Sequence, residues 1–132
     1  MTNNKILYLE DHDDTREMMK LILEQAGFAV TTADLGAECL RLFDESPDYD
    51  LLLLDHTFKD ASGVSICMAI REKDTQIPIL FYSTRAFPKE REEAIKAGAN
   101  GYLVKPVDLL HVADHVKRLI DENKEVVLTT SG

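Results

Sequence analysis

An α/β fold is predicted, with a doubly wound parallel sheet of five strands in the order 2-1-3-4-5 and five helices. Short apolar runs suited to buried strands alternate along the chain with longer amphipathic runs suited to helices. Strands that are joined by helices pair in parallel and carry helices on both faces of the sheet. The run at 51–54 is apolar at every position, as expected for a strand covered on both faces.

Each element in the first half of the chain has its own signal. Apolar residues at helical spacing predict a helix over 14–25, and Gly27 is placed to end it. Asp34 can cap a second helix over 35–45. The strands of this half are predicted at 6–9, 28–32 and 51–54.

The second half of the chain continues the alternation. Ser62 and Gly63 open a helix that runs to about Lys73, and Pro88 can occupy the first turn of a helix that ends before Gly98. Strands are predicted at 79–83 and 102–104, and a last helix at 107–123. The apolar face of that helix consists of Leu110, Ala113, Val116, Leu119 and Ile120. We expect one domain over residues 1–123 and a short tail or linker over 124–132.

Composition and charge exclude several classes of protein. Hydrophobic residues make up 45% of the 132 residues, which is enough for a packed core and excludes a wholly disordered chain. The net charge of −9 disfavours direct binding to nucleic acid or to an anionic membrane. Cys39 and Cys67 form no closely spaced pair, and residues 1–4 carry no apolar signal core. We therefore expect a cytoplasmic domain that interacts with other proteins.

Polar side chains follow four of the predicted strands at their carboxyl ends, which share one edge of a parallel sheet. They are Glu10, Asp11, Asp55, Ser83 and Lys105. Clustered carboxylates repel one another, and a hard divalent cation such as Mg²⁺ relieves that repulsion. A carboxylate beside such a cation can attack phosphorus, while an ammonium and a hydroxyl bind the phosphoryl oxygens. The set therefore predicts a phosphoryl-transfer site.

Four segments that surround these residues carry a specific resemblance. They are Lys5–Asp11 (KILYLED), Asp50–Gly63 (DLLLLDHTFKDASG), Pro78–Thr84 (PILFYST) and Ala97–Pro106 (AGANGYLVKP). Over about residues 4–122 the chain resembles the receiver domain of response regulators in two-component systems. The resemblance implies a flavodoxin-like receiver fold and a signalling domain that catalyses only its own phosphorylation and dephosphorylation.

The resemblance also assigns roles to individual residues. Asp55 matches the aspartate that accepts a phosphoryl group from a histidine kinase or a histidine phosphotransfer protein. The Mg²⁺ ligands would be Glu10, Asp11, Asp55 and the backbone carbonyl of Thr57. Ser83 and Tyr102 match the switch pair, in which the aromatic ring turns inward when the hydroxyl moves toward the phosphoryl group. Lys105 matches the lysine that contacts that group, and Lys105–Pro106 matches a bond that is usually cis.

Four positions tune the expected site. Lys59 stands where many relatives carry proline, so the loop after Asp55 gains a positive charge and loses some rigidity. Thr84 stands where relatives have a very small residue and would narrow access to Asp55. Thr57 and Arg85 fall at positions that, in the family that the chain resembles, tune the lifetime of the phosphoaspartate, and Arg85 either clamps the phosphate or lies in solvent.

Other functions remain open at this stage. A receiver-like interaction module that is not phosphorylated is one, and a phosphohydrolase is another, although Thr57 stands where such enzymes carry a second acid. The acidic first loop argues against a flavin phosphate. A zinc site at His12 and His56 has no established spacing. Output is expected from a downstream protein partner or a missing output domain, and a homodimer is possible through the fourth helix, fifth strand and last helix.

Overall fold

A computed structural model describes residues 4–85, 87–105 and 111–131 of the chain. The strands are β1 (Lys5–Leu9), β2 (Ala29–Ala33), β3 (Leu51–Leu54), β4 (Ile79–Ser83) and β5 (Gly101–Val104). The helices are α1 (Asp13–Gln25), α2 (Gly36–Glu45), α3 (Gly63–Lys73), α4 (Pro88–Ala97) and α5 (Val112–Ser131). Strands and helices alternate along the chain as the sequence predicts, with most boundaries within one residue of those expected.

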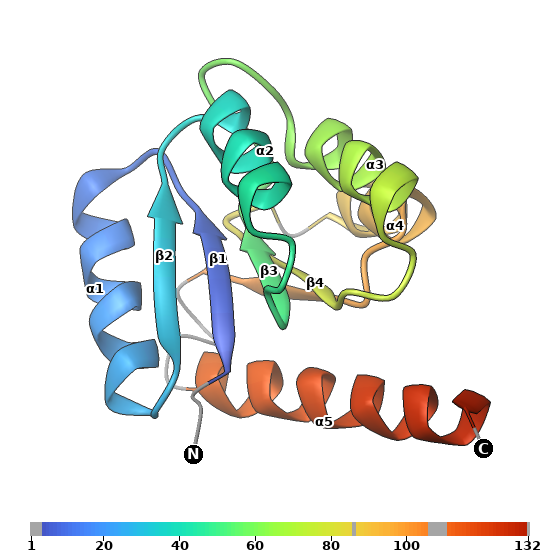
Figure 1. Ribbon diagram of the computed structural model, residues 1–132. Coiled ribbons are helices and arrows are strands. Elements are labelled where there is room, and N and C mark those ends of the chain that lie inside the picture. Colours follow the sequence, from blue (N-terminus) through green and yellow to red (C-terminus); the bar gives the residue numbers. More distant parts are fainter. Residues whose placement is uncertain (1–3, 86, 106–110, 132) are drawn as a thin grey trace.

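All neighbouring strands of the sheet pair in parallel, in the order β2-β1-β3-β4-β5 (Figure 1). The chain starts at β1, the strand next to one edge of the sheet, moves to that edge at β2, and then crosses back beyond β1 toward the other edge. The order therefore reverses between β1 and β3, and the loops after these two strands diverge there. A doubly wound sheet places its binding site at this reversal, so the predicted order and the predicted location of the site agree.

Helices cover both faces of the sheet and bury two separate apolar layers. On one face, α1 and α5 bury Met19, Leu23, Val112 and Val116 against the sheet. On the other face, α2, α3 and α4 pack against the opposite side chains of the same strands, and these include Leu52, Leu54 and Phe81. Burial on both faces explains why β3 carries no polar residue.

Local signals in the sequence begin and end most of the helices. Ser62 caps α3, and its side chain and that of Ser65 form a reciprocal capping box. Pro88 begins α4. Gly27 and Gly98 follow α1 and α4 with φ values of 100° and 114°, a left-handed conformation that favours glycine. These four residues confirm the corresponding sequence predictions.

The predicted cap of α2 is wrong. The N-cap residue is Leu35, which makes no side-chain cap bond, and Asp34 precedes it. The cap comes instead from Asp60 in the β3–α3 loop, whose carboxylate accepts hydrogen bonds from the backbone N–H groups of Gly36 at 2.8 Å and Ala37 at 3.0 Å. These two bonds tie the loop that follows Asp55 to the start of α2.

Replacing Asp60 with alanine is expected to lower the free energy of unfolding by about 1 kcal/mol, because two N–H groups of α2 lose their acceptor. The N–H groups of Ala37 and Gly36 lower the pKa of Asp60. Because the pKa of Asp60 is lower in the folded chain, its ionised carboxylate stabilises the fold fully above pH values of about 3.9, the ordinary aspartate pKa. This contribution is lost as pH falls through the lower pKa of the folded chain. Urea unfolding at several pH values would measure this. Asp34→Ala is the control, and an equal loss in that variant would contradict the assignment.

The last helix differs from its prediction at its C-terminal end. The helix was expected to end near Asn123, but α5 continues to Ser131. No glycine or proline stands between these two residues to stop it. Its predicted apolar face is confirmed for Val116, Leu119 and Ile120, which are buried, whereas Leu110 lies outside the described residues. The division into a domain over 1–123 and a tail over 124–132 stays a prediction. Among the described helices, none is both long enough and apolar enough to cross a membrane.

Candidate functional site

Lys105 joins two carboxylates at the carboxyl edge of the sheet. Its ammonium donates to Asp55 Oδ2 at 2.8 Å and also to Glu10 Oε1. The three residues come directly after β5, β3 and β1. Glu10 and Lys105 are 95 residues apart in the sequence, and the strand order alone brings them together. The sequence prediction that these side chains converge is confirmed.

Burial makes this bridge stronger than a surface ion pair. The side chain of Glu10 is only 1% exposed, that of Lys105 13% and that of Asp55 18%. Burial by itself would lower the pKa of Lys105, but the hydrogen bonds to Asp55 and Glu10 outweigh it and raise that pKa. Lys105 therefore stays charged and holds the two carboxylates close together.

Glu10 is held from several sides besides Lys105. Its carboxylate accepts from the Tyr8 hydroxyl at 3.4 Å and from the backbone N–H of His12 at 3.3 Å. Its backbone carbonyl accepts from Arg16 Nη1 at 2.9 Å. Burial raises the pKa of the Tyr8 hydroxyl, and the nearby carboxylates of Glu10 and Asp55 raise it further. Tyr8 thus remains a donor, and the buried Glu10 carboxylate is fixed in place.

Asp55 is the accessible carboxylate of the bridge. Its Oδ1 accepts from the backbone N–H of His56 at 2.6 Å, while Oδ2 faces Lys105. Both oxygens therefore have donors, but the side chain keeps some contact with solvent. A small donor molecule has a route to this carboxylate and a far poorer one to Glu10. Chemistry at this edge is therefore expected on Asp55.

The predicted metal ligands fit a hard cation in their chemistry. Glu10 and Asp55 supply carboxylate oxygens, the half-buried Asp11 follows Glu10, and Thr57 follows Asp55 by two residues. Two of these carboxylates already share one positive charge, the Lys105 ammonium. Across the described residues, however, no three or more His, Cys, Asp and Glu side chains are arranged to hold a metal ion. The ligand set predicted from the sequence therefore stays a prediction.

The predicted switch pair lies beside the bridge. Ser83 ends β4 and is 1% exposed, and its hydroxyl accepts from the backbone N–H of Arg85 at 3.1 Å. The Tyr102 ring stacks on Phe81, with 5.7 Å between centroids and 9° between planes. The Tyr102 hydroxyl donates to the carbonyl of Arg85 at 2.6 Å. The ring is therefore fixed against the end of the sheet, at the same segment that the Ser83 hydroxyl contacts.

The residues that were predicted to tune the site are all exposed. Thr57, Lys59, Thr84 and Arg85 have exposed side chains at the rim of the sheet edge. Arg85 lies 3.9 Å from Glu90, an ion pair whose arginine is 50% exposed. This pair favours the second of the two alternatives for Arg85, a side chain in solvent. Pro106 lies outside the described residues, so the predicted cis bond does too.

Two residues have roles at the site that sequence reasoning did not assign to them. Gly63 begins α3 so close to β3 that a Cβ atom there would lie 2.1 Å from the Asp55 carbonyl oxygen. His56 is buried, 7% exposed, beside Phe81 and Tyr102. If the alternation of β3 continues past its end, residue 56 lies on the same buried face as Leu52 and Leu54. This pattern could have predicted that His56 is buried.

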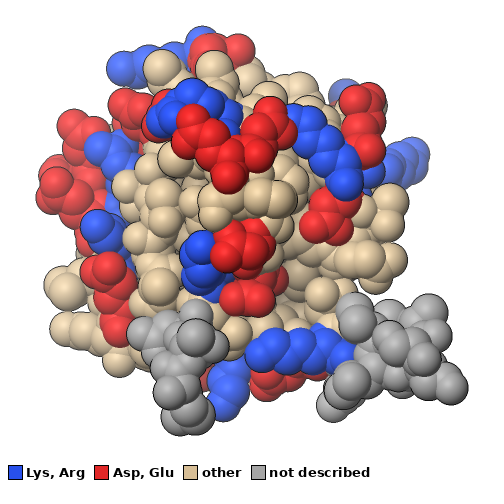
Figure 2. All heavy atoms as spheres, in the orientation of Figure 1, with Lys and Arg blue, Asp and Glu red and all other residues tan. Residues whose placement is uncertain are grey.

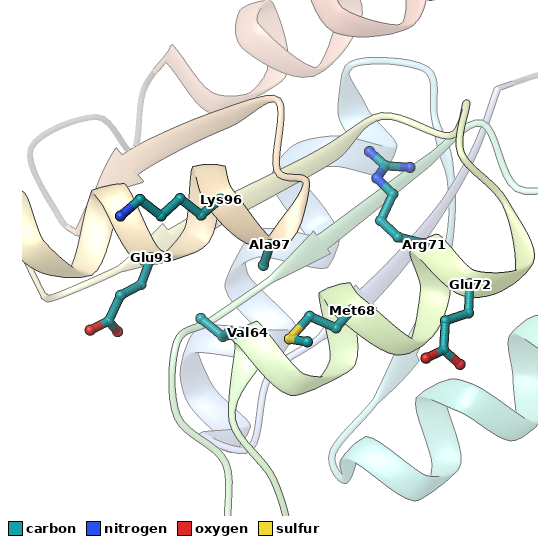
Figure 3. Close-up of a pocket in the computed structure, with 7 residues that line it drawn as sticks. All are labelled: Val64, Met68, Arg71, Glu72, Glu93, Lys96 and Ala97. Atoms are coloured by element: carbon teal, nitrogen blue, oxygen red, sulfur yellow. The ribbon is translucent and has the colours of Figure 1, made fainter.

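A groove of about 630 Å³ between α3 and α4 is separate from this site (Figure 3). Val64 and Met68 from α3 and Ala97 from α4 line its apolar part, and charged side chains surround them. None of the predicted site residues lines it. This groove therefore lies apart from the carboxyl edge of the sheet, where Glu10, Asp55 and Lys105 come together.

Comparison with protein families gives one consistent result. The family model of the response regulator receiver domain matches residues 6–117. The transcriptional regulatory protein PrrA of Mycobacterium tuberculosis is 32% identical over 131 residues, which is 99% of this chain and 56% of that protein. ResD of Bacillus subtilis, also a transcriptional regulatory protein, is 32% identical over 116 residues, 88% of this chain and 48% of that protein. The chain thus spans about half the length of these curated relatives.

Solved structures give the same picture. A response regulator receiver domain protein from Clostridium thermocellum superposes with a TM-score of 0.87 at 27% identity, covering 93% of this chain and 98% of that one. The chemotaxis protein CheY4 of Vibrio cholerae superposes with a TM-score of 0.84 at 28% identity, covering 89% of this chain and 99% of that one. These structures share the fold over nearly their whole length.

Proposed function

Since the chain belongs to the response regulator receiver domain family, we propose that Asp55 accepts a phosphoryl group from the phosphohistidine of a histidine kinase or a histidine phosphotransfer protein. The observation that carries this proposal is the bridge from Lys105 to Asp55 and Glu10 at the carboxyl edge of the sheet. It presents one partly exposed carboxylate beside a fixed positive charge, which is the arrangement that phosphoryl transfer needs.

In the proposed reaction a carboxylate oxygen of Asp55 attacks phosphorus and forms an acyl phosphate. The P–N bond to the donor histidine breaks, and its electron pair stays on the imidazole nitrogen. Lys105, 2.8 Å from Asp55 Oδ2, is placed to pair with the phosphoryl oxygens as they arrive. The buried Ser83 hydroxyl can donate to one of those oxygens after it leaves the Arg85 N–H. Later attack by water on phosphorus releases phosphate and restores the carboxylate.

Mg²⁺ is the cofactor that this proposal includes. The residues that would hold it are Glu10, Asp11, Asp55 and the backbone carbonyl of Thr57. Bound there, the ion would neutralise negative charge that develops on the phosphoryl group. Glu10 and Asp55 support the assignment because they already gather around one positive charge.

Partners and output also belong to the proposal. The named relatives are transcriptional regulatory proteins about twice as long as this chain, which supports either an output domain in a longer protein or a separate downstream partner. The proposal also includes a homodimer through α4, β5 and α5.

On the face drawn in Figure 2, Lys and Arg side chains lie among Asp and Glu and form no broad basic patch. That face and the net charge of −9 support protein partners in the cytoplasm over nucleic acid or membrane.

Intact mass after incubation with acetyl phosphate and Mg²⁺ tests the proposed function. We expect one phosphoryl adduct on the wild-type chain, none on Asp55→Asn, and none when the metal is chelated. Asp55→Asn removes the nucleophile but keeps the shape of the side chain, so its fold should be unchanged by circular dichroism. If neither acetyl phosphate, a phosphorylated histidine kinase nor beryllofluoride modified or bound Asp55, the chain would act as an interaction module that is not phosphorylated.

A further inference from the structure

Three rings meet at the end of the sheet next to Asp55, and we call them the ring cluster: His56, Phe81 and Tyr102. Phe81 and Tyr102 stack nearly parallel. His56 meets Tyr102 edge-on, with 6.4 Å between centroids and 64° between planes, and meets Phe81 at 5.9 Å and 59°. Aromatic pairs in these arrangements attract one another beyond simple burial. A shift of the His56 ring must therefore change the packing of Tyr102.

His56 is also attached directly to the proposed phosphoacceptor. Its backbone N–H donates to Asp55 Oδ1 at 2.6 Å, and its carbonyl accepts from the N–H of Gly63 at 2.7 Å. The residue thus has one hydrogen bond to the Asp55 side chain, one to the start of α3, and a ring against Tyr102. Within the described residues this is a short physical connection from Asp55 Oδ1 to the switch ring.

The histidine side chain is costly at this position. Its Nε2 atom is buried and has no hydrogen-bond partner among the residues that the structure describes, and a buried polar atom without a partner destabilises a fold. Leucine or phenylalanine would fill an apolar layer without that cost. Packing alone therefore does not account for a histidine between the phosphoacceptor and the ring that is proposed to switch.

We propose that His56 is a positioning residue that couples the state of Asp55 to the position of Tyr102. This inference rests on the proposed function. When Asp55 becomes an acyl phosphate, its oxygens carry a different charge, and the hydrogen bond from the His56 N–H to Oδ1 changes in length and direction. The backbone of His56 moves with it, and the ring transmits the movement to Tyr102. The Tyr102 hydroxyl, bonded to the Arg85 carbonyl, passes the change to the segment between β4 and α4.

The test follows Tyr102 itself by fluorine NMR. The chain is labelled with fluorotyrosine, and the Tyr102 signal is assigned by its loss in Tyr102→Phe. Spectra are recorded before and after phosphorylation with acetyl phosphate and Mg²⁺, with adduct formation measured by mass. In His56→Leu we expect a full adduct on Asp55 but a displacement of the Tyr102 signal that is less than half that of the wild type. His56→Phe keeps an aromatic edge and should retain most of the displacement.

Controls separate this role from general destabilisation and from failure of the proposed function. Ile70→Val, in the same apolar layer, should lower stability and leave the displacement of the Tyr102 signal unchanged. A full adduct with an undiminished displacement in both His56 variants would overturn the coupling role while leaving Asp55 as phosphoacceptor. No adduct on the wild-type chain with any donor would overturn the proposed function, and the coupling role with it.

Discussion

Replacing Lys105 with methionine is expected to lower the free energy of unfolding by about 2–4 kcal/mol in buffer that contains a chelator. The substitution removes the one ammonium that Glu10 and Asp55 share and leaves the buried Glu10 carboxylate beside a second negative charge. Methionine fills much of the same volume, so the loss is mainly electrostatic. Urea unfolding followed by circular dichroism measures it, and the acetyl phosphate assay should show slower adduct formation.

The matched control restores charge balance without restoring the lysine. Adding Glu10→Gln to the Lys105→Met chain neutralises the buried carboxylate, so the double variant is expected to recover more than half of the lost stability. Lys5→Met, which removes a lysine from the exposed pair with Asp48, should cost less than about 1 kcal/mol. A Lys105→Met chain as stable as the wild type would contradict the bridge as a stabilising element.

The same bridge gives a dependence on pH. The pKa of Lys105 is raised in the folded chain. The charged Lys105 ammonium therefore stabilises the fold fully at pH values below about 10.4, the ordinary lysine pKa. This contribution disappears as pH rises through the higher pKa of Lys105 in the folded chain. The stability difference between the wild type and Lys105→Met should therefore be constant near neutral pH and shrink as pH rises into the strongly alkaline range.

The site was predictable where it depends on strand ends. Glu10, Asp55 and Lys105 each follow an apolar run, and parallel strands bring their carboxyl ends to one edge whatever the loops do. The residue types then indicate the chemistry. The direction of the Lys105 side chain toward both carboxylates was not predictable, because that choice depends on the distances between strands, which the strand pattern alone does not give.

Three features of the structure were not predicted from the sequence. Asp34 stands directly before α2 and has the usual chemistry of a cap, yet Asp60, 24 residues beyond Gly36, accepts its N–H group. The extent of α5 was also missed, because the polar composition after Asn123 resembled a tail although no residue there stops a helix. His56 was treated as a polar residue beside an acidic site, and its burial in an aromatic layer was not foreseen.

The misses at Asp60 and His56 share a physical cause and lie in one loop. The β3–α3 loop is held by Asp60 at α2, by the ring of His56 in the apolar layer, and by the hydrogen bond from Gly63 to His56. Lys59 carries no ring that fixes its backbone φ, as a proline at this position would. Contacts to neighbouring elements then fix a loop that proline would otherwise stiffen. These contacts and β3 together position Asp55.

Gly63→Ala is the second substitution with a large expected effect. An added Cβ would lie 2.1 Å from the Asp55 carbonyl oxygen and 2.7 Å from Phe81 Cε2. The first of these neighbours is backbone and cannot rotate away, so α3 must move off the sheet. Overpacking of this kind costs about 1–3 kcal/mol, although alanine gains up to about 1 kcal/mol in a helix. We expect a net loss of stability in urea unfolding, together with slower formation of the Asp55 adduct.

Gly27→Ala is the control, because alanine at this position is destabilising through backbone strain and not through a steric clash. Among the described residues, no atom beyond Gly27 and its two chain neighbours lies within 4 Å of a Cβ at Gly27, but its φ of 100° strains any other residue. That variant should lose about 1 kcal/mol and still form the adduct at the wild-type rate. Gly63→Ala should slow the adduct even under conditions where both variants are fully folded, since it displaces the peptide of Asp55 itself. Equal adduct rates in the two variants, or a stabilised Gly63→Ala chain, would show that the start of α3 does not constrain Asp55, the proposed phosphoacceptor.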